Sequence, residues 1–487
     1  MLAKNIATGA AWLLTLKFIM RGIGVVSTFL LVRLLSPEDF GLNAIAMSIF
    51  GFVELLSRFG FDTVLIQKQD ADHNHYDTAW SLNVCFGLLA CLLILLFSSF
   101  VTNFYGDPRL RSILYCVSVL FLINGFLNIG IVDFRKNLTF DKEFKLQIFP
   151  KVISFVVTIA IAYIYRNYWA LVVGTLVWKG LILLMSYIMS SYRPKLRFTA
   201  WRDLFDFSKW IFIGNFFNFL NVKTPELLIA RIISPAATGY MAVSREISDF
   251  ATSELVSNVN RAAYPGYSKI SHDLKQLREL YSGVMSNILF WAFPAGIGLS
   301  SVASLLVPVV LGDQWTDTIP LIQCLAIASM IFSLNSNTSY IFLAVGKPRT
   351  NVIMSLIRVS LFIPLLLYLL STQGILGGAY AILIASFITM LLYNYVVMTE
   401  LKIKLKAVVS IYFRPLLSSW LMALGIYLFK ENILIDYQIN NIYALLTCVF
   451  LGVMLYSVTT LSLWCLGGRK QGPEKSILVL LKNRFSS

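Results

Sequence analysis

The sequence predicts an all-α integral membrane protein with about fourteen transmembrane helices. Its 487 residues are 57% hydrophobic and only 13% charged, whereas about a quarter of the residues in soluble domains are charged. Apolar stretches of about 20 residues or more, the length needed to cross a bilayer, follow one another along the whole chain. Fourteen such stretches leave room only for short loops and one short tail, so we expect no separate soluble catalytic domain.

Turn-forming residues such as Ser36-Pro37 and those at 371–374 separate these stretches. The first stretch carries Lys17 and Arg21 and lacks a small-residue cleavage site, so we expect it to remain as the first helix. The expected spans cover residues 8–34, 40–66, 77–102, 109–132, 146–165, 167–190, 207–233, 236–264, 281–311, 317–345, 350–371, 375–399, 408–430 and 440–467.

The basic residues of the loops predict the orientation. With the N-terminus placed in the cytoplasm, most loop lysines and arginines fall on the cytoplasmic side, and Arg109, Arg111, Arg166 and Lys430 fall outside. This positive-inside bias predicts an even number of spans with both termini cytoplasmic. It also explains much of the net charge of +15 without a nucleic-acid partner.

An internal repeat divides the chain. Residues 32–41 read VRLLSPEDFG and residues 230–239 read ARIISPAATG, so spans 1 and 2 correspond to spans 7 and 8. Parallel repeats are typical of rocking transporters whose substrate site lies between the halves. The sequence therefore predicts an N-lobe at 1–206, a C-lobe at 207–407, two extra helices at 408–467 and a cytoplasmic tail at 468–487.

Several basic residues lie deep within predicted spans, where a charge costs at least ~2.5 kcal/mol and normally faces a protein interior or a water-filled cavity. One interpretation is a cationic cavity near the midplane that binds an anionic substrate. The alternative is internal pairing, of Arg245 with Asp249 and of Lys223 with Glu226. The candidate substrate-binding residues are Lys17, Arg21, Lys223, Arg245, Lys179 and Arg358.

Intramembrane carboxylates could couple transport to H⁺ or Na⁺, because a carboxylate in a low-dielectric cavity can bind a proton near neutral pH. Pairing is the simpler role for Glu54, which lies one helical turn before Arg58. No nucleotide-binding or metalloprotease motif is present, so no cofactor is expected. The candidate coupling residues are Asp249, Glu254, Glu54 and Glu226.

Other polar and thiol groups predict neither a metal site nor a disulfide. Asp70, Asp72, His73 and His75 superficially suggest a metal or sugar-nucleotide site, but they lie in a polar cytoplasmic loop between spans 2 and 3. The six cysteines lie in apolar segments and form no C-x-x-C pair, so we expect buried thiols. No catalytic residue is expected.

Four stretches together resemble a known family. They are RLLSPEDFG at 33–41, ELLSRFGFDTVLIQKQD at 54–70, NRAAYPGYSKI at 260–270 and LGDQWTDTIPLIQCLAIA at 311–328. In order and spacing they resemble the polysaccharide-transporter branch of the MOP exporter superfamily, and within it the WzxC-type lipopolysaccharide and exopolysaccharide flippases. The resemblance implies two six-helix lobes, two extra helices and alternating access in a bacterial inner membrane.

The same resemblance implies a substrate and partners. The substrate would be an oligosaccharide repeat unit on undecaprenyl pyrophosphate, moved to the periplasmic leaflet for O-antigen, capsule or exopolysaccharide assembly. A polysaccharide polymerase and a chain-length regulator are the implied protein partners. Two alternatives within the superfamily stay open: a lipid II-type peptidoglycan precursor flippase and a small-solute or drug antiporter. An embedded polymerase or glycosyltransferase is disfavoured, because the predicted outside loops are too short for a catalytic surface.

Overall fold

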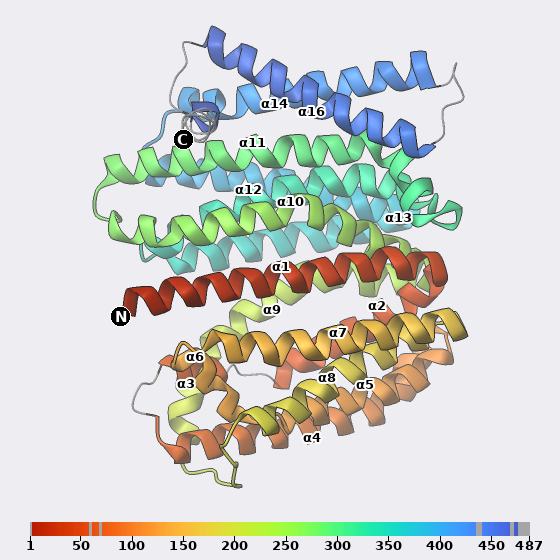
Figure 1. Cartoon of the computed structure of the whole chain (residues 1–487), viewed down its shortest axis with the longest axis vertical. Coiled ribbons are helices and arrows are strands. Elements are labelled where there is room, and N and C mark those ends of the chain that lie inside the picture. Colours follow the sequence, from red (N-terminus) through yellow and green to blue (C-terminus); the bar gives the residue numbers. More distant parts are fainter. Residues whose placement is uncertain (1, 58–60, 68–70, 435–440, 468–471, 476–487) are drawn as a thin grey trace. The chain divides into compact units, whose positions relative to one another are not determined.

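The computed structural model describes residues 2–57, 61–67, 71–434, 441–467 and 472–475, and in these residues the secondary structure is helical without strands (Figure 1). The chain divides into two compact units, Met1–Gly239 and Tyr240–Ser487. The α-helices are α1 Leu2–Leu34, α2 Pro37–Ser57, α3 Phe61–Gln67, α4 His73–Tyr105, α5 Arg109–Gly125, α6 Val132–Lys136, α7 Phe140–Tyr165, α8 Trp169–Met189, α9 Trp201–Ile232, α10 Pro235–Lys269, α11 Leu274–Leu306, α12 Thr318–Ala344, α13 Pro348–Glu400, α14 Leu405–Phe429 and α16 Asn441–Leu466.

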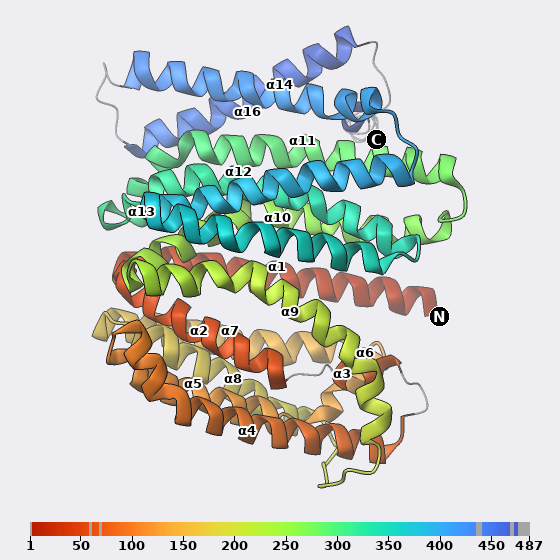
Figure 2. The same ribbon diagram turned by 180° about the vertical axis from the view of Figure 1, so that it is seen from behind.

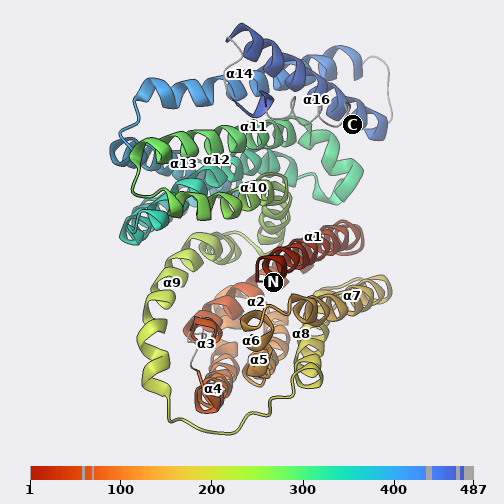
Figure 3. The same cartoon turned by 60° about the vertical axis from the view of Figure 1, so that its left-hand side comes forward.

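The first unit is built from helix pairs. Helices α4 and α5 pack together, as do α7 and α8, and α1 lies along α7. The helix α9 packs against α2, α3 and α4, and its curved course is visible in Figure 3. This helix carries Pro225 in its interior, and a proline there removes a backbone hydrogen bond and bends the helix. The repeat assigns α9 to the start of the second lobe, and that lobe boundary stays a prediction.

The second unit is centred on α11, which contacts α12, α14 and α16 (Figure 2). Its largest buried cluster joins residues of α10, α11, α12 and α13, including Tyr267, Leu289 and Phe342. The helices α14 and α16 pack on each other and on α11. The two helices that lie outside the repeat are therefore attached to this unit through α11.

The all-α membrane fold is confirmed. In the described residues, nine helices are long and apolar enough to cross a membrane, and the bent α5–α6 pair makes a tenth. The helix α13 contains two predicted spans that meet at Gly374. The charged helices α2, α9 and α10 are also at least 21 residues long, which is enough to span at a rise of about 1.5 Å per residue. These three helices are not among those apolar enough to be identified as spans by composition, so the count of fourteen stays a prediction.

Two predicted spans are not continuous helices. The span predicted at 40–66 consists of α2 and the short α3, with residues 58–60 between them outside the described part. The span predicted at 109–132 ends at Gly125 and continues, after a 64° bend, as Ile129–Lys136. Asn128 fixes this bend, because its side chain accepts from the Gly130 amide and donates to the Tyr192 carbonyl.

The two repeated turns contact each other reciprocally within the first unit. Pro37 and Pro235 begin α2 and α10, and the hydroxyls of Ser36 and Ser234 each accept from the third backbone amide that follows, as helix N-caps do. A side chain at Gly41 would overlap the Pro235 carbonyl, and one at Gly239 would overlap the Pro37 carbonyl. The repeat therefore brings its own two copies into backbone contact.

Gly374 separates the two halves of α13. Its backbone conformation predicts that replacing it with alanine lowers the stability of the protein. Its φ of 60° and ψ of −144° lie in a region that residues with a side chain rarely enter, at a cost of about 1–3 kcal/mol. We expect Gly374→Ala to lower thermal stability in detergent, measured by the loss of monodisperse protein on heating. Gly180→Ala in α8, where a methyl group meets no atom within 4 Å, should leave that stability unchanged. Equal melting of the two variants would contradict the prediction.

Candidate functional site

A buried ion pair lies between α9 and α2 in the first unit. Glu226 Oε2 accepts from Lys223 Nζ at 2.7 Å and from Ser48 Oγ at 2.6 Å. Glu226 is 6% exposed and Ser48 is fully buried, whereas the Lys223 side chain is 31% exposed. Lys223 and Glu226 thus form the internal ion pair that the alternative interpretation expects. A role of either residue in substrate or ion binding stays a prediction.

A second group of charges joins α10, α12 and α13 in the second unit. Arg245 Nε lies 3.7 Å from Asp249 Oδ2, one turn further along α10. The other carboxylate oxygen of Asp249 accepts from Ser329 Oγ of α12 at 2.5 Å. Arg358 of α13 is close enough for the charge of Arg245 to act on it. Arg245 therefore interacts electrostatically with both Asp249 and Arg358.

The direct contacts of Arg358 are with neutral groups. Its guanidinium lies 4.4 Å from the centroid of the Phe332 ring, and one terminal nitrogen is 3.5 Å from Ser386 Oγ. Its buried Nε has no hydrogen-bond partner among the described residues, and within that same part of the chain no carboxylate forms a salt bridge with it. Arg358 lies about 15 Å along α13 from Pro348 at the usual helical rise. A deep cation with spare donors can bind an anion.

The remaining predicted cations lie on two helices of the first unit. Lys17 and Arg21 are half-buried and one turn apart on α1. Lys179 on α8 lies 5.2 Å from the Trp178 ring centroid, and Lys151 of α7 lies 4.5 Å from the same ring. Cation–π contact stabilises such lysines by roughly 0.5–2 kcal/mol. A role of Lys17, Arg21 and Lys179 in substrate binding stays a prediction.

Glu54 lines a small polar cavity of about 70 Å³ inside the first unit, together with Asp62, Asn83, Asn124 and Asn128. Carboxylate and amide oxygens are the ligands that hard cations prefer. In the described residues no group of three or more His, Cys, Asp or Glu side chains could hold a metal ion. The side chain of Glu254, the fourth candidate coupling residue, lies outside the described part, as does Arg58.

The loop residues Asp72 and His75 have a structural role. They form the capping box that begins α4. The hydrogen bond from the His75 side chain lowers the pKa of Asp72 to about 2, so this cap stays charged throughout the physiological pH range.

Two features of the second unit were not predicted from the sequence. One is a polar seam on α12, where Asn337 accepts from Tyr267 at 3.0 Å and Ser336 accepts from Asn260 at 2.6 Å. A run of Ser, Asn and Thr at 333–339 within an apolar span signals this seam. The other feature, an apolar groove, has no comparable signal, because its residues resemble those of any lipid-facing helix.

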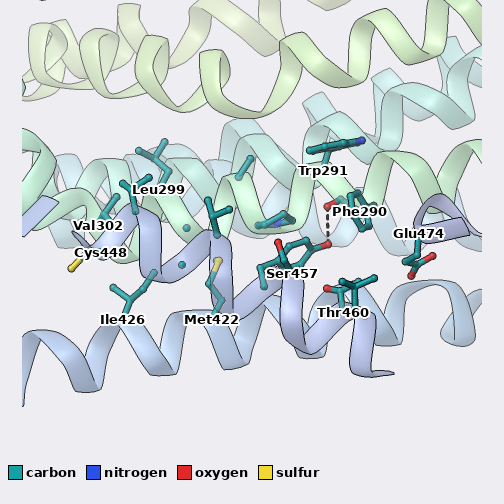
Figure 4. Close-up of a pocket in the computed structure, with 18 residues that line it drawn as sticks. Phe290, Trp291, Leu299, Val302, Met422, Ile426, Cys448, Ser457, Thr460 and Glu474 are labelled. Carbon is teal, nitrogen blue, oxygen red and sulfur yellow. Dashed lines mark hydrogen bonds between the residues drawn. The ribbon is translucent and has the colours of Figure 1, made fainter. Parts of the chain in front are cut away.

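The apolar groove has a volume of about 630 Å³ and lies between α11, α14 and α16 (Figure 4). Phe290, Trp291 and Leu299 line it from α11, and Met422 and Ile426 line it from α14. Residues 448–461 of α16 complete the wall. Its volume falls in the range of sites that hold sizeable organic ligands.

One end of the groove is polar. In Figure 4, Glu474 and Thr460 lie at the same end, near Phe290. Glu474 also forms a salt bridge with Arg414 of α14, at 3.3 Å. The groove thus combines a long apolar wall with one charged end.

Comparison with known proteins identifies relatives of the whole chain. The family model described as "Polysaccharide biosynthesis protein" matches residues 30–320. The lipopolysaccharide biosynthesis protein WzxC of Escherichia coli (strain K12) is 25% identical, and the match covers 90% of this chain and 88% of that protein. The succinoglycan biosynthesis transport protein ExoT of Rhizobium meliloti (strain 1021) is 21% identical, covering 94% and 93%.

A solved structure shows the same fold. The lipid II flippase MurJ, in an inward closed conformation, superposes with a TM-score of 0.74 at 16% sequence identity. The superposition covers 92% of this chain and 98% of that one. The likeness extends over nearly the full length of both chains and concerns the fold alone.

Proposed function

Because this chain belongs to the polysaccharide biosynthesis protein family, we propose that it is a flippase for oligosaccharides linked to an isoprenoid diphosphate. It moves undecaprenyl-diphosphate-linked repeat units from the cytoplasmic to the periplasmic leaflet of the inner membrane by alternating access. Both termini are cytoplasmic, and the protein acts as a transporter rather than as an enzyme. Family membership and relatives named for polysaccharide biosynthesis and transport support this assignment.

The deep arginines of the second unit carry the proposal. Arg245 pairs with Asp249, and Arg358 lies within range of the charge of Arg245 while its own direct contacts are the neutral Ser386 hydroxyl and the Phe332 ring. Holding such charge within a membrane is costly unless it binds an anion. A diphosphate carries at least two negative charges and accepts paired hydrogen bonds from guanidinium groups. The charge of the site therefore matches the linkage between lipid and sugar.

The apolar groove supports the same substrate. An isoprenoid chain is a long hydrocarbon, and each CH₂ group removed from water contributes about 0.8 kcal/mol. The groove between α11, α14 and α16 offers an apolar wall of matching chemistry. A small polar solute or a drug would need no such groove, so this feature favours a lipid-linked substrate over an antiporter. A peptidoglycan precursor shares the isoprenoid diphosphate, and the family match favours a surface polysaccharide.

Coupling to an ion gradient is part of the proposal. The polar cavity at Glu54 and the carboxylate of Asp249 beside Ser329 are the described groups that could bind H⁺ or Na⁺. An energy source of this kind fits a sequence without a nucleotide-binding motif.

The test removes the charge of Arg358. We expect Arg358→Gln to lower transport roughly 10- to 100-fold, the loss that accompanies one or two charge-assisted hydrogen bonds. Transport is measured as the appearance of a fluorescent undecaprenyl-diphosphate oligosaccharide in the outer leaflet of proteoliposomes. Arg349→Gln, an exposed residue near the start of the same helix, should transport normally.

The same assay separates the alternatives. Transport of the lipid-linked oligosaccharide by neither wild type nor Arg349→Gln would overturn the proposed function. Preference for a lipid-linked muropeptide over the oligosaccharide would assign the chain to peptidoglycan synthesis. Wild-type transport by Arg358→Gln would remove this arginine from the site.

A further inference from the structure

The charged end of the apolar groove consists of one buried ion pair. Glu474 Oε1 lies 3.3 Å from an Arg414 terminal nitrogen. Glu474 is only 5% exposed, and the Arg414 side chain is 27% exposed. Arg414 belongs to α14, whereas Glu474 lies in residues 472–475, beyond the end of α16. A segment that is not part of any groove helix therefore places a carboxylate inside the groove.

This carboxylate is incompletely satisfied. Glu474 Oε2 is buried and has no hydrogen-bond partner among the described residues. Thr460 is 2% exposed. An orphaned buried polar atom is uncommon and destabilising, by about 1–3 kcal/mol. A buried ion pair is likewise weak evidence of stabilisation, since desolvation opposes the attraction. The Arg414–Glu474 pair is therefore better suited to be replaced by another anion than to hold the structure together permanently.

We propose that Glu474 occupies, in the substrate-free protein, the place on Arg414 that a phosphate of the isoprenoid diphosphate takes when the lipid chain enters the groove. Residues 472–475 are then a latch that the substrate displaces. Carboxylate and phosphate oxygens use the same guanidinium donors, and a diphosphate brings more negative charge than one carboxylate. Thr460, which is buried at the same end of the groove, adds a hydroxyl group to this site. This inference rests on the proposed function and adds an entry site to it.

The experiment measures binding of undecaprenyl diphosphate to the full chain in lipid nanodiscs, through the change in tryptophan fluorescence, to which Trp291 in the groove contributes together with the other nine tryptophans. Because Glu474→Gln removes the competing charge, we expect its affinity to rise roughly tenfold, the equivalent of one charge-assisted hydrogen bond. We expect the affinity of Arg414→Gln to fall at least about tenfold, because this variant lacks the guanidinium that would bind the phosphate. Glu400→Gln breaks a comparable pair with Lys347 at the protein surface and should bind like wild type.

A rise in affinity in Glu474→Gln together with a fall in Arg414→Gln would identify the latch. If the ion pair stays formed when the lipid binds, Glu474→Gln and Arg414→Gln should both lower the affinity for undecaprenyl diphosphate to a similar extent. That result would overturn the inference. Monodispersity and melting temperature, measured on both variants, show whether each is folded. If wild-type protein transports the lipid-linked oligosaccharide while neither variant changes its binding, the latch fails and the proposed function stands.

Three further probes identify the ligand chemistry. Undecaprenol has the chain without the phosphates, so its binding should not respond to Glu474→Gln. The affinity for phosphatidylglycerol should rise little in Glu474→Gln. A rise equal to that for undecaprenyl diphosphate would assign the site to anionic lipids in general. Tight binding of inorganic pyrophosphate alone would show that the groove plays no part and would also overturn the inference.

Discussion

Replacement of Gly41 by alanine is expected to lower strongly the melting temperature and the yield of folded protein, and replacement of Gly239 is expected to do the same. A methyl group at either position overlaps a backbone carbonyl, that of Pro235 or that of Pro37. A backbone obstacle cannot rotate away as a side chain can, so the two turns must separate. We expect a cost near the upper end of the 1–3 kcal/mol measured for overpacked interiors, a large part of a total stability of about 5–15 kcal/mol.

The measurement is the amount of monodisperse protein recovered from membranes, followed by its melting temperature in detergent. Gly24→Ala in α1 is the matched control, because nothing lies within 4 Å of the added methyl group and alanine favours the helix. Because the contact is reciprocal, the two variants should be similarly affected. Normal yield and melting of Gly41→Ala would show that the repeated turns do not touch.

The fold was predictable because a bilayer imposes a length on each helix. The expected span at 317–345 corresponds to α12 at Thr318–Ala344, and that at 408–430 to α14 at Leu405–Phe429. The bend after Gly125 was not predictable, since it depends on a hydrogen bond from Asn128 to Tyr192. That partner lies far along the chain, and no local pattern signals it.

Some contacts of the candidate site were likewise predictable from the sequence, and others were not. Pairs one turn apart, such as Arg245 with Asp249, follow from helical geometry. Their partners on other helices, Ser329 and Ser48, depend on how the helices pack. The groove was missed because apolar residues in a transmembrane helix carry no mark that separates a lipid-facing wall from a binding surface.

The ion pair between Lys223 and Glu226 provides the second large effect. Glu226→Ala leaves Lys223 without its carboxylate and the buried Ser48 hydroxyl without its acceptor. Breaking a buried pair costs about 3–5 kcal/mol, and we expect the lower figure because Lys223 is 31% exposed. The melting temperature and the yield of folded protein in detergent should therefore fall. Glu400→Ala, at the surface pair with Lys347, should cost less than about 1 kcal/mol.

A double variant then decides between the two interpretations of Lys223. Replacing both partners by apolar residues of similar size, as in Lys223→Met with Glu226→Leu, removes the unpaired charge, so most of the stability should return. The remaining deficit of about 1–3 kcal/mol comes from the Ser48 hydroxyl, which still lacks its acceptor. A stable double variant that transports normally assigns the pair to the packing of α9 on α2. A stable but inactive one keeps Lys223 among the residues that bind the substrate. Failure of the double variant to recover stability would mean that the pair is not the source of the loss in Glu226→Ala.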